Sequence, residues 1–416
     1  MTNLINRWHQ TQLLVAILVL LNSNWVQAYL KPVFCTECMA QKEEALNRQT
    51  ISTSPISDGI LFNCSIADVK FIKKEMQNYL RELGIQKNHV LITDDQNGKL
   101  FYTLNTPKDD TNTLNLKQRR HYQIKDELVW LPTNTLKKRS QLTVSKKEIL
   151  MALMQHGRTP ELNGSNCQVA TLKDHVGIRQ NVVAWSENLN WDWPDGESAY
   201  WNTQYWDEGT PLKTVSVVDA FRDVFINQKK YSFGCYTASK MVYAHAILDY
   251  YSRIKKHAVN LKKVIDSLNQ NADPIVGIEP GNMWYFEGDF DPAEKDRPGK
   301  LLSLLEPVAS KNFIPGDWSY FLNTNPKTYQ KTGYEGSNAI YLGRNKFDDF
   351  YNDHNHFYTL NEKLDEVFQW RNEVFSRSRD AAKIQKLSAQ DYENLTRTPN
   401  QGGLIFNFRA VPKWNF

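Results

Sequence analysis

Helical and strand-like spacings of apolar residues follow one another along most of the chain. The pattern predicts helices at 66–83, 146–155, 214–225 and 235–251, and strands at 59–63, 90–93, 100–104 and 339–342. The turn signal Asn97-Gly98 separates two of these strands, which is typical of a hairpin. Such a mixture of helices and strands indicates an α+β protein.

The N-terminus has the pattern of an export signal. Arg7 precedes an unbroken apolar run at 13–21, and Ala28 supplies the small residue that signal peptidases require. The run is shorter than the ~20 residues of a membrane span, so the alternative of an uncleaved anchor is less favoured. We therefore predict that residues 1–28 are a signal peptide, that the mature chain is periplasmic or secreted, and that no stable membrane insertion remains.

Net charge and cysteine content restrict the possible partners and the candidate reactive residues. The formal net charge of +4 is small for the length of the chain, so no nucleic-acid partner is expected. Cysteines of exported proteins tend to pair, and an odd one is a candidate reactive thiol. The five cysteines are Cys35, Cys38, Cys64, Cys167 and Cys235. Because four of them lie in the N-terminal half, we expect Cys235 to stay outside any disulfide.

The remaining four cysteines allow more than one arrangement. Cys35 and Cys38 can form a structural disulfide with each other, or two bridges to Cys64 and Cys167. A redox pair is less favoured because the Cys-x-x-Cys lies so close to the cleavage site. A zinc site would need irregular ligand spacing. We expect no metal and no cofactor, and the chain has no acidic loop of the EF-hand type.

Two regions are predicted after the signal. Residues 29–145 form a small N-terminal α/β region in which we find no catalytic constellation, and residues 146–416 form the catalytic domain. Asp174-His175 could suggest a metal site, but we interpret it as an ordinary surface loop. Residues 185–206 are rich in Trp and Tyr, which indicates a core corner or the wall of a cleft rather than a sugar-binding groove.

Cys235 has the most distinctive local setting. It falls at the first turn of the apolar helix predicted at 235–251. Free amides and the dipole at a helix start favour negative charge, so they lower the pKa of a thiol, and the thiolate is the nucleophile. Gly234 permits close approach of a substrate backbone or an unusual backbone angle. The competing interpretation is a buried small hydrophobic residue.

A thiolate nucleophile needs an imidazole partner. His245 lies on the same helix, ten residues on and about 15 Å away at ~1.5 Å per residue, so it is excluded. His354 and His356 follow the strand predicted at 339–342, and such distance in sequence is usual for a Cys/His pair.

Three short stretches of the sequence, or blocks, resemble the motifs of a known protein family. They are Phe233-Gly234-Cys235-Tyr236-Thr237-Ala238, Gly316-Asp317-x-x-Tyr320-Phe321 and Gly336-Ser337-Asn338-Ala339-Ile340-Tyr341-Leu342-Gly343. In this order they resemble the motifs of the bacterial spore-coat type protein-glutamine gamma-glutamyltransferases, or transglutaminases. The resemblance extends over about residues 199–376, and residues 29–198 show none.

The resemblance implies a papain-like or NlpC/P60-like core, in which a Cys-bearing helix packs on an antiparallel sheet. Cys235 would attack a glutamine carboxamide, release ammonia and form a thioester, which a lysine amine resolves. The partners implied are proteins that present Gln and Lys side chains. The implied catalytic residues are Cys235, His354, Glu335 and Asp353, and the implied substrate-binding residues are Gly234, Tyr334, Trp318 and Tyr320.

The chain departs from the family pattern at its acidic positions. Gly234 and Ser337 stand where the family has Glu. Glu335 is a nearby substitute, since residues two apart on a strand face the same side. Asp353 or Asn352 can orient the histidine, for which His354 is the better match and His356 the second. Two alternatives therefore stay open: a papain-like amidase or peptidase with the same Cys/His pair, and a catalytically impaired exported binding protein.

Overall fold

The structure is a computed structural model that describes residues 59–105, 127–133, 138–156, 161–194, 199–207, 209–270, 302–305, 313–325, 327–328, 334, 336–352, 357–374, 382–397, 401–406 and 409–412. The predicted signal peptide, Cys35, Cys38, Glu335, and the segment 353–356 with Asp353, His354 and His356 lie outside these residues.

Helices and strands alternate along the described chain. The helices are α3 (Ile66–Glu82), α4 (Lys146–His156), α5 (Val169–Ser186), α6 (Val217–Ile226), α7 (Cys235–Asp249), α8 (Ala258–Gln270), α9 (Leu360–Arg371) and α10 (Ala389–Leu395). Shorter turns are the 3-10 helices η1 (Lys87–His89), η4 (Gly164–Asn166) and η5 (Gln228–Lys230), and the π-helix η6 (Tyr250–Ile254) that continues α7.

The strands are β1 (Ile60–Asn63), β2 (Val90–Asp94), β3 (Lys99–Leu104), β4 (Glu127–Pro132), β5 (Lys138–Thr143), β6 (Leu162–Asn163), β7 (Trp206–Asp207), β8 (Thr210–Pro211), β9 (Leu302–Leu305), β10 (Trp318–Leu322), β11 (Gly336–Gly343), β12 (Lys346–Asp348), β13 (Phe357–Tyr358), β14 (Ile405–Phe406) and β15 (Arg409–Pro412). The predicted elements are confirmed to within a few residues, and the mixture of helix and sheet agrees with the expected class.

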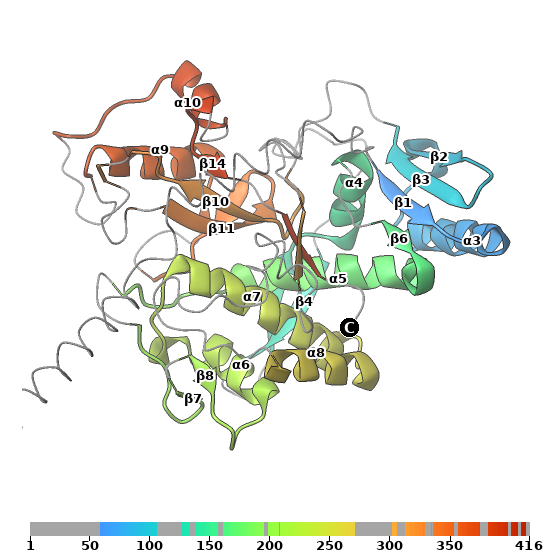
Figure 1. Cartoon of the computed structure of the whole chain (residues 1–416), viewed down its shortest axis with the longest axis horizontal. Helices are drawn as coiled ribbons and strands as arrows, with labels where there is room; N and C mark the ends of the chain where they lie inside the picture. Colours follow the sequence, from blue (N-terminus) through green and yellow to red (C-terminus); the bar gives the residue numbers. More distant parts are fainter. Residues whose placement is uncertain are drawn as a thin grey trace, which may run out of the picture.

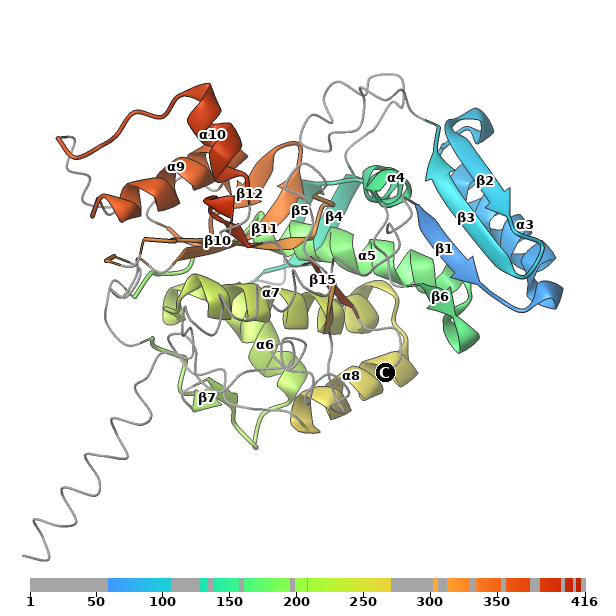
Figure 2. The ribbon, with the colours of Figure 1, turned by 45° about the horizontal axis from the view of Figure 1, so that its top comes forward.

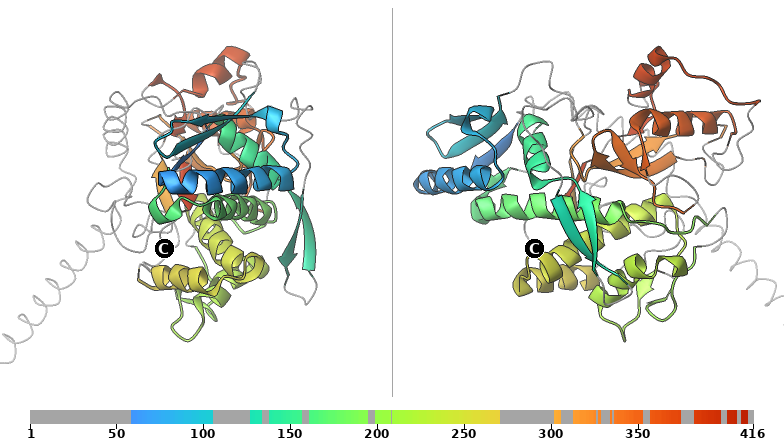
Figure 3. Two further views of the ribbon diagram at one scale, coloured as in Figure 1. Left: turned by 90° about the vertical axis from the view of Figure 1, so that its right-hand side faces the viewer. Right: turned by 180° about the vertical axis from the view of Figure 1, so that it is seen from behind.

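Two larger sheets organise the described residues. The N-terminal sheet has the order β2-β3-β1-β6 and packs against α3 at one end of the molecule (Figure 3). The second sheet has the order β13-β12-β11-β10-β14, and all its pairings are antiparallel. It lies between α7 and α5 on one side and α9 on the other (Figure 1).

Side-chain alternation on β10 and β11 produces this three-layer arrangement. Trp318 and Ile340 face α7 and join its aromatic core, while Phe321 and Tyr341 face α9. The helix α7 is buried on every side from Tyr236 to Asp249 and lies at the centre of the molecule (Figure 2).

The predicted boundary at 145/146 stays a prediction. The N-terminal sheet includes β6, which follows that boundary and pairs in parallel with β1. Its core also includes Ile149 of α4 and Leu172 of α5. The N-terminal layer, formed by this sheet and the helices packed on it, therefore contains elements from both sides of the predicted boundary.

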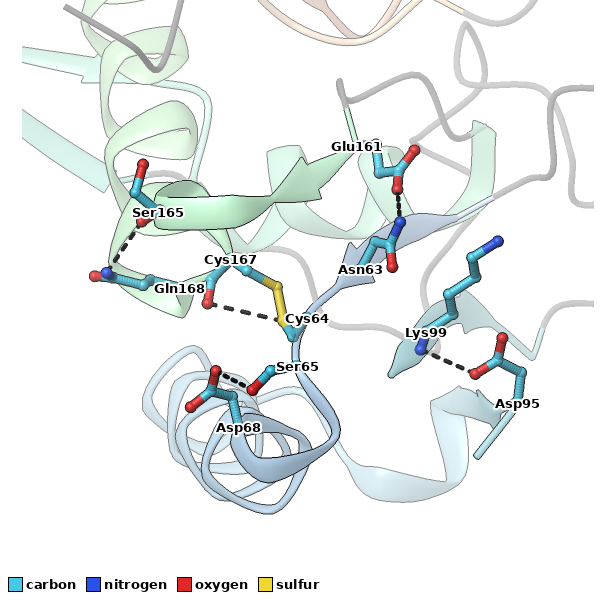
Figure 4. Close-up of a disulfide and its surroundings, with 10 residues drawn as sticks. All are labelled: Asn63, Cys64, Ser65, Asp68, Asp95, Lys99, Glu161, Ser165, Cys167 and Gln168. Carbon is cyan, nitrogen blue, oxygen red and sulfur yellow. Dashed lines mark hydrogen bonds between the residues drawn. A yellow bond between two sulfur atoms is a disulfide. The ribbon is translucent and has the colours of Figure 1, made fainter. Parts of the chain in front are cut away.

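A disulfide joins Cys64 to Cys167 within this N-terminal layer, with a Cα–Cα distance of 5.5 Å (Figure 4). It ties the start of α3 to the turn before α5. Next to it, Asn63 donates a side-chain hydrogen bond to Glu161. The pairing excludes one of the open arrangements, because neither Cys64 nor Cys167 remains for a bridge to Cys35 or Cys38.

The interpretation of Asp174-His175 as a surface loop was wrong. Both residues lie within α5 and are buried. Asp174 accepts a hydrogen bond from the Tyr250 hydroxyl (3.0 Å) and pairs with Lys255. His175 accepts from Nε of Arg179 (2.8 Å). Partners from η6 and the chain after it make Asp174 compatible with burial, and Arg179 of the same helix does so for His175.

Candidate active site

The thiol of Cys235 lies at the N-terminus of the buried helix α7. Gly234 is the N-cap residue, with φ −70° and ψ 165°, which is ordinary extended backbone. No side chain caps this end of the helix, so its first-turn amides are not engaged by a capping side chain. Cys235 is partly exposed and forms no disulfide within the described part of the chain. These features place a reduced thiol where the helix dipole favours negative charge.

The sulfur meets the second sheet at the edge of β11. Among described residues, β12 pairs with β11 only at Tyr341 and Gly343, so the amides of Asn338 and Ile340 on that edge take no part in a ladder with β12. Both amides bond elsewhere instead: Ile340 N–H to the Asp348 carboxyl (2.6 Å) and Asn338 N–H to Sγ of Cys235 (3.3 Å). Buried amides need hydrogen-bond partners. Because β12 does not pair with this part of β11, the Asn338 amide is left to bond the thiol of Cys235.

Asn338 also approaches the sulfur with its side chain. Its Nδ2 lies 3.5 Å from Sγ, and its Oδ1 accepts a hydrogen bond from the indole Nε1 of Trp318 (3.0 Å). Trp318 is 1% exposed, and its ring lies 5.5 Å from that of Tyr236. The predicted substrate-binding residue Trp318 therefore contacts Asn338 and the aromatic core.

The other predicted substrate-binding residues lie in different surroundings. Tyr320 is buried and is paired in register with Asn338, and its ring lies close to Gly336. Tyr334 is partly buried and packs against the apolar cluster on the α9 side of the sheet. Its carbonyl accepts from Nδ2 of Asn323 (2.8 Å). Gly234, Trp318 and Tyr320 are thus on the α7 side, and their substrate-binding roles stay predictions.

His354 and Asp353 lie outside the described residues, but the residues just before them lie next to the loop that precedes Cys235. The Tyr351 hydroxyl donates to the carbonyl of Phe233 (3.1 Å), two residues before Cys235. The side chain of Asn352 donates a hydrogen bond to Asp192. On the far side of the segment, β13 pairs with β12. The pairing of Cys235 with His354 stays a prediction that these anchors support.

Main-chain contacts hold Tyr351 and Asn352 in the same position. Asn352 N–H donates to the Trp191 carbonyl at 3.0 Å, and Trp191 and Tyr351 form a parallel bridge. The rings of Trp193 and Tyr351 meet edge to face, with centroids 4.9 Å apart. The chain that leads to residue 353 is therefore held by the segment that precedes β7, next to the loop before Cys235.

Ser337 faces away from Cys235. Its hydroxyl accepts a hydrogen bond from Nζ of Lys363 on α9 (3.3 Å), and Lys363 also pairs with Glu366 (3.2 Å). Burial alone would lower the pKa of Lys363, but the carboxylates of Glu366 and Asp349 raise it overall. On the described strand the neighbouring residue Asn338, and not Ser337, occupies the face toward the thiol.

Sequence reasoning missed two polar residues at this edge, Asn338 and Asp348. Burial raises the pKa of Asp348 well above its ordinary value, although the Ile340 amide and Lys363 oppose this shift. The only sequence signal was the presence of each polar residue inside an apolar or aromatic strand. Such a residue must find a partner when it is buried, but the pattern does not say which one.

No cluster of three or more His, Cys, Asp or Glu side chains among the described residues is arranged to hold a metal ion. None of the described helices combines the length and apolar character needed to cross a membrane.

Comparison with known proteins gives a family match. The family described as protein-glutamine gamma-glutamyltransferase matches residues 121–398, more than half of the chain and beyond both ends of the range 199–376. A solved transglutaminase from Geobacillus stearothermophilus, without its C-terminal extension, is similar at 17% identity and a TM-score of 0.35, covering 58% of this chain and 93% of that one. No curated protein matches.

Proposed function

Because this chain belongs to the protein-glutamine gamma-glutamyltransferase family, we propose that it transfers the acyl group of a glutamine carboxamide to a lysine amine through a thioester on Cys235. The observation that supports this most directly is the partly exposed thiol at the start of α7, with two N–H groups of Asn338 directed at its sulfur. Donors to sulfur and the helix dipole favour the thiolate over the thiol.

The proposed reaction has two balanced steps. The Cys235 thiolate attacks the carboxamide carbon, the C–N bond breaks, and ammonia leaves with a proton supplied by the imidazolium of His354. The lysine amine then attacks the thioester carbon and gives its proton to the imidazole of His354. The C–S bond breaks, and an isopeptide and the Cys235 thiolate remain. Both steps need only side chains of this protein and its two substrates.

We assign supporting roles to the other predicted residues. Asp353 or Asn352 orients the imidazole of His354, and Gly234, Tyr334, Trp318 and Tyr320 contribute to the substrate site. A papain-like core is the proposed fold. The packing of α7 on the antiparallel strands β10 and β11 supports it.

The proposed location is periplasmic or secreted. The Cys64–Cys167 disulfide supports it, since disulfides persist mainly in oxidising compartments. The apolar run that ends before Ala28 supports removal of a signal peptide on export.

The test of the proposed function measures two products from the same protein substrate. The purified chain should release ammonia from casein and incorporate a dansylated primary amine, and Cys235→Ala should abolish both. His354→Ala should lower both rates by about 10²–10⁴-fold, the usual contribution of a general acid–base, whereas His356→Ala is the matched control and should stay near wild type.

The other outcomes identify the alternatives. Ammonia release without amine incorporation would indicate a papain-like amidase or peptidase that uses the same thiol. Neither product from the wild-type chain would indicate an exported binding protein that has lost catalysis. Equal losses in the two histidine variants would reject the assignment of His354.

A further inference from the structure

The side-chain amide of Asn338 has one orientation that satisfies both of its neighbours. The indole N–H of Trp318 can only donate a hydrogen bond, so the atom that faces it at 3.0 Å must be the amide oxygen. The NH₂ group then points to Sγ of Cys235, at 3.5 Å. A donor-only partner thus decides the assignment of oxygen and nitrogen, which an amide alone leaves ambiguous.

The main chain of Asn338 adds a second donor. Its N–H lies 3.3 Å from the same sulfur, on the part of the β11 edge that β12 does not pair. Strand geometry fixes the position of this amide, because residues 336–340 are paired with β10 on the other side. Two N–H groups from a single residue of the sheet therefore point at the thiol with which α7 begins.

The surroundings make this arrangement rigid. Asn338 is 4% exposed and Trp318 is 1% exposed. The indole packs against Tyr236 and Tyr243 of α7, with ring centroids 5.5 and 6.4 Å away. Rotation of the Asn338 amide would place its oxygen lone pairs against the sulfur and its NH₂ against the indole N–H. The first contact would be repulsive for the thiolate, and the second would bring two donors together.

We propose that Asn338 is the residue that stabilises the Cys235 thiolate before attack, and that Trp318 is a positioning residue that acts through the Asn338 amide. This inference rests on the proposed function of Cys235 as a nucleophile. It gives Trp318 a role beside the nucleophile, through Asn338, in addition to its proposed contribution to the substrate site. Hydrogen bonds to a charged acceptor are stronger than neutral ones, so losing a donor raises the pH at which the thiol ionises.

The test follows ionisation of Cys235 itself. The rate of iodoacetamide alkylation is measured against pH on the Cys235 peptide by mass spectrometry, so other cysteines do not contribute. In Asn338→Ala the midpoint of this curve should rise by about one pH unit, which is about tenfold less thiolate at low pH. Asn338→Asp should shift it further, because a carboxylate replaces the donor with a like charge.

Trp318→Phe keeps an aromatic ring but removes the N–H that holds the amide. Its alkylation midpoint should rise by less than that of Asn338→Ala, which means about threefold less thiolate than wild type at low pH. The smaller effect is expected because the Asn338 main-chain donor remains. Two matched controls should leave the midpoint unchanged. Ser337→Ala changes the neighbouring residue on the opposite face of β11, and Trp206→Phe removes an indole N–H that bonds Ala220 elsewhere in the same core.

Folding is checked for each variant by circular dichroism and thermal unfolding. If Asn338→Ala does not fold, Asn338→Asp gives the answer, since it keeps the side-chain volume and an oxygen for the Trp318 indole. The proposal is overturned if the Asn338 variants alkylate with the wild-type midpoint, or if the controls shift as much as they do. Shifted midpoints in a chain without transfer activity would support this inference and reject the proposed function. Wild-type midpoints in the Asn338 variants of a chain with transfer activity would reject this inference and support the proposed function.

Discussion

His245 is a fully buried imidazole on α7, stacked on Phe225 with ring centroids 4.1 Å apart and close to Trp185. Neither ring nitrogen has a hydrogen-bond partner among the described residues. Burial lowers the pKa of His245 to about 4, although the nearby Asp249 carboxylate acts in the opposite direction. A charged imidazole at this position would have to leave water without any compensating bond.

This depressed pKa predicts acid destabilisation. The unfolded chain binds the proton near pH 6.5 and the folded chain only near 4, so stability is full above 6.5 and falls as pH drops between these values. The loss amounts to about 3 kcal/mol over the window. His245→Phe keeps the stacked ring and should flatten the dependence of the unfolding free energy on pH between 6.5 and 4, measured by urea denaturation.

The exposed residue His257 provides the control; it directly precedes α8, and its Nδ1 accepts a hydrogen bond from the Asn260 amide (3.2 Å). His257→Phe should retain the wild-type slope. An unchanged slope in His245→Phe would show that other groups cause the acid sensitivity.

At the scale of elements, a buried ion pair joins α5 to the start of β10. Nη1 of Arg179 lies 2.9 Å from the Asp317 carboxylate and 3.1 Å from the Pro315 carbonyl. Gly316 has φ +84°, and a Cβ there would lie 3.3 Å from Arg179 atoms. Glycine and aspartate in the block Gly316-Asp317 thus place β10, and with it Trp318, relative to α5.

Removing one partner of this pair should be costly. Arg179→Met leaves the Asp317 carboxylate buried without its cation, so the unfolding free energy should fall by about 3–5 kcal/mol in chemical denaturation. The double variant Arg179→Met/Asp317→Asn should recover part of the loss. The control Arg222→Met breaks the exposed pair with Asp219 and should change stability by less than about 1 kcal/mol. Similar losses in both single variants would contradict this account.

At the scale of the whole molecule, the Cys64–Cys167 disulfide closes a loop with a sequence separation of 103 residues. Cross-links over long loops restrict the unfolded chain most. Cys64→Ser/Cys167→Ser should therefore lower the unfolding free energy by about 2–4 kcal/mol while the pH midpoint of Cys235 alkylation stays unchanged. Wild type in reducing agent is the control and should match the double variant. A changed midpoint would show that the N-terminal layer also shapes the thiol site.

The sequence determined the features that depend on local spacing. The apolar spacing after Gly234 placed Cys235 at a helix start, and α7 begins at that residue. The same reasoning located α3, β2 and β3, because helices and strands have different hydrophobic periods. The three motif blocks were enough to indicate the family.

Only the tertiary structure decided which elements meet. It placed Asn338 rather than Ser337 beside the thiol, paired Cys64 with Cys167, and buried Asp174 and His175. The physical reason is that periodicity reports which side of an element is buried, but not against which neighbour. Pairing of β12 with β11 ends before Asn338, and this register, set by contacts between distant segments, is what leaves an amide for Cys235.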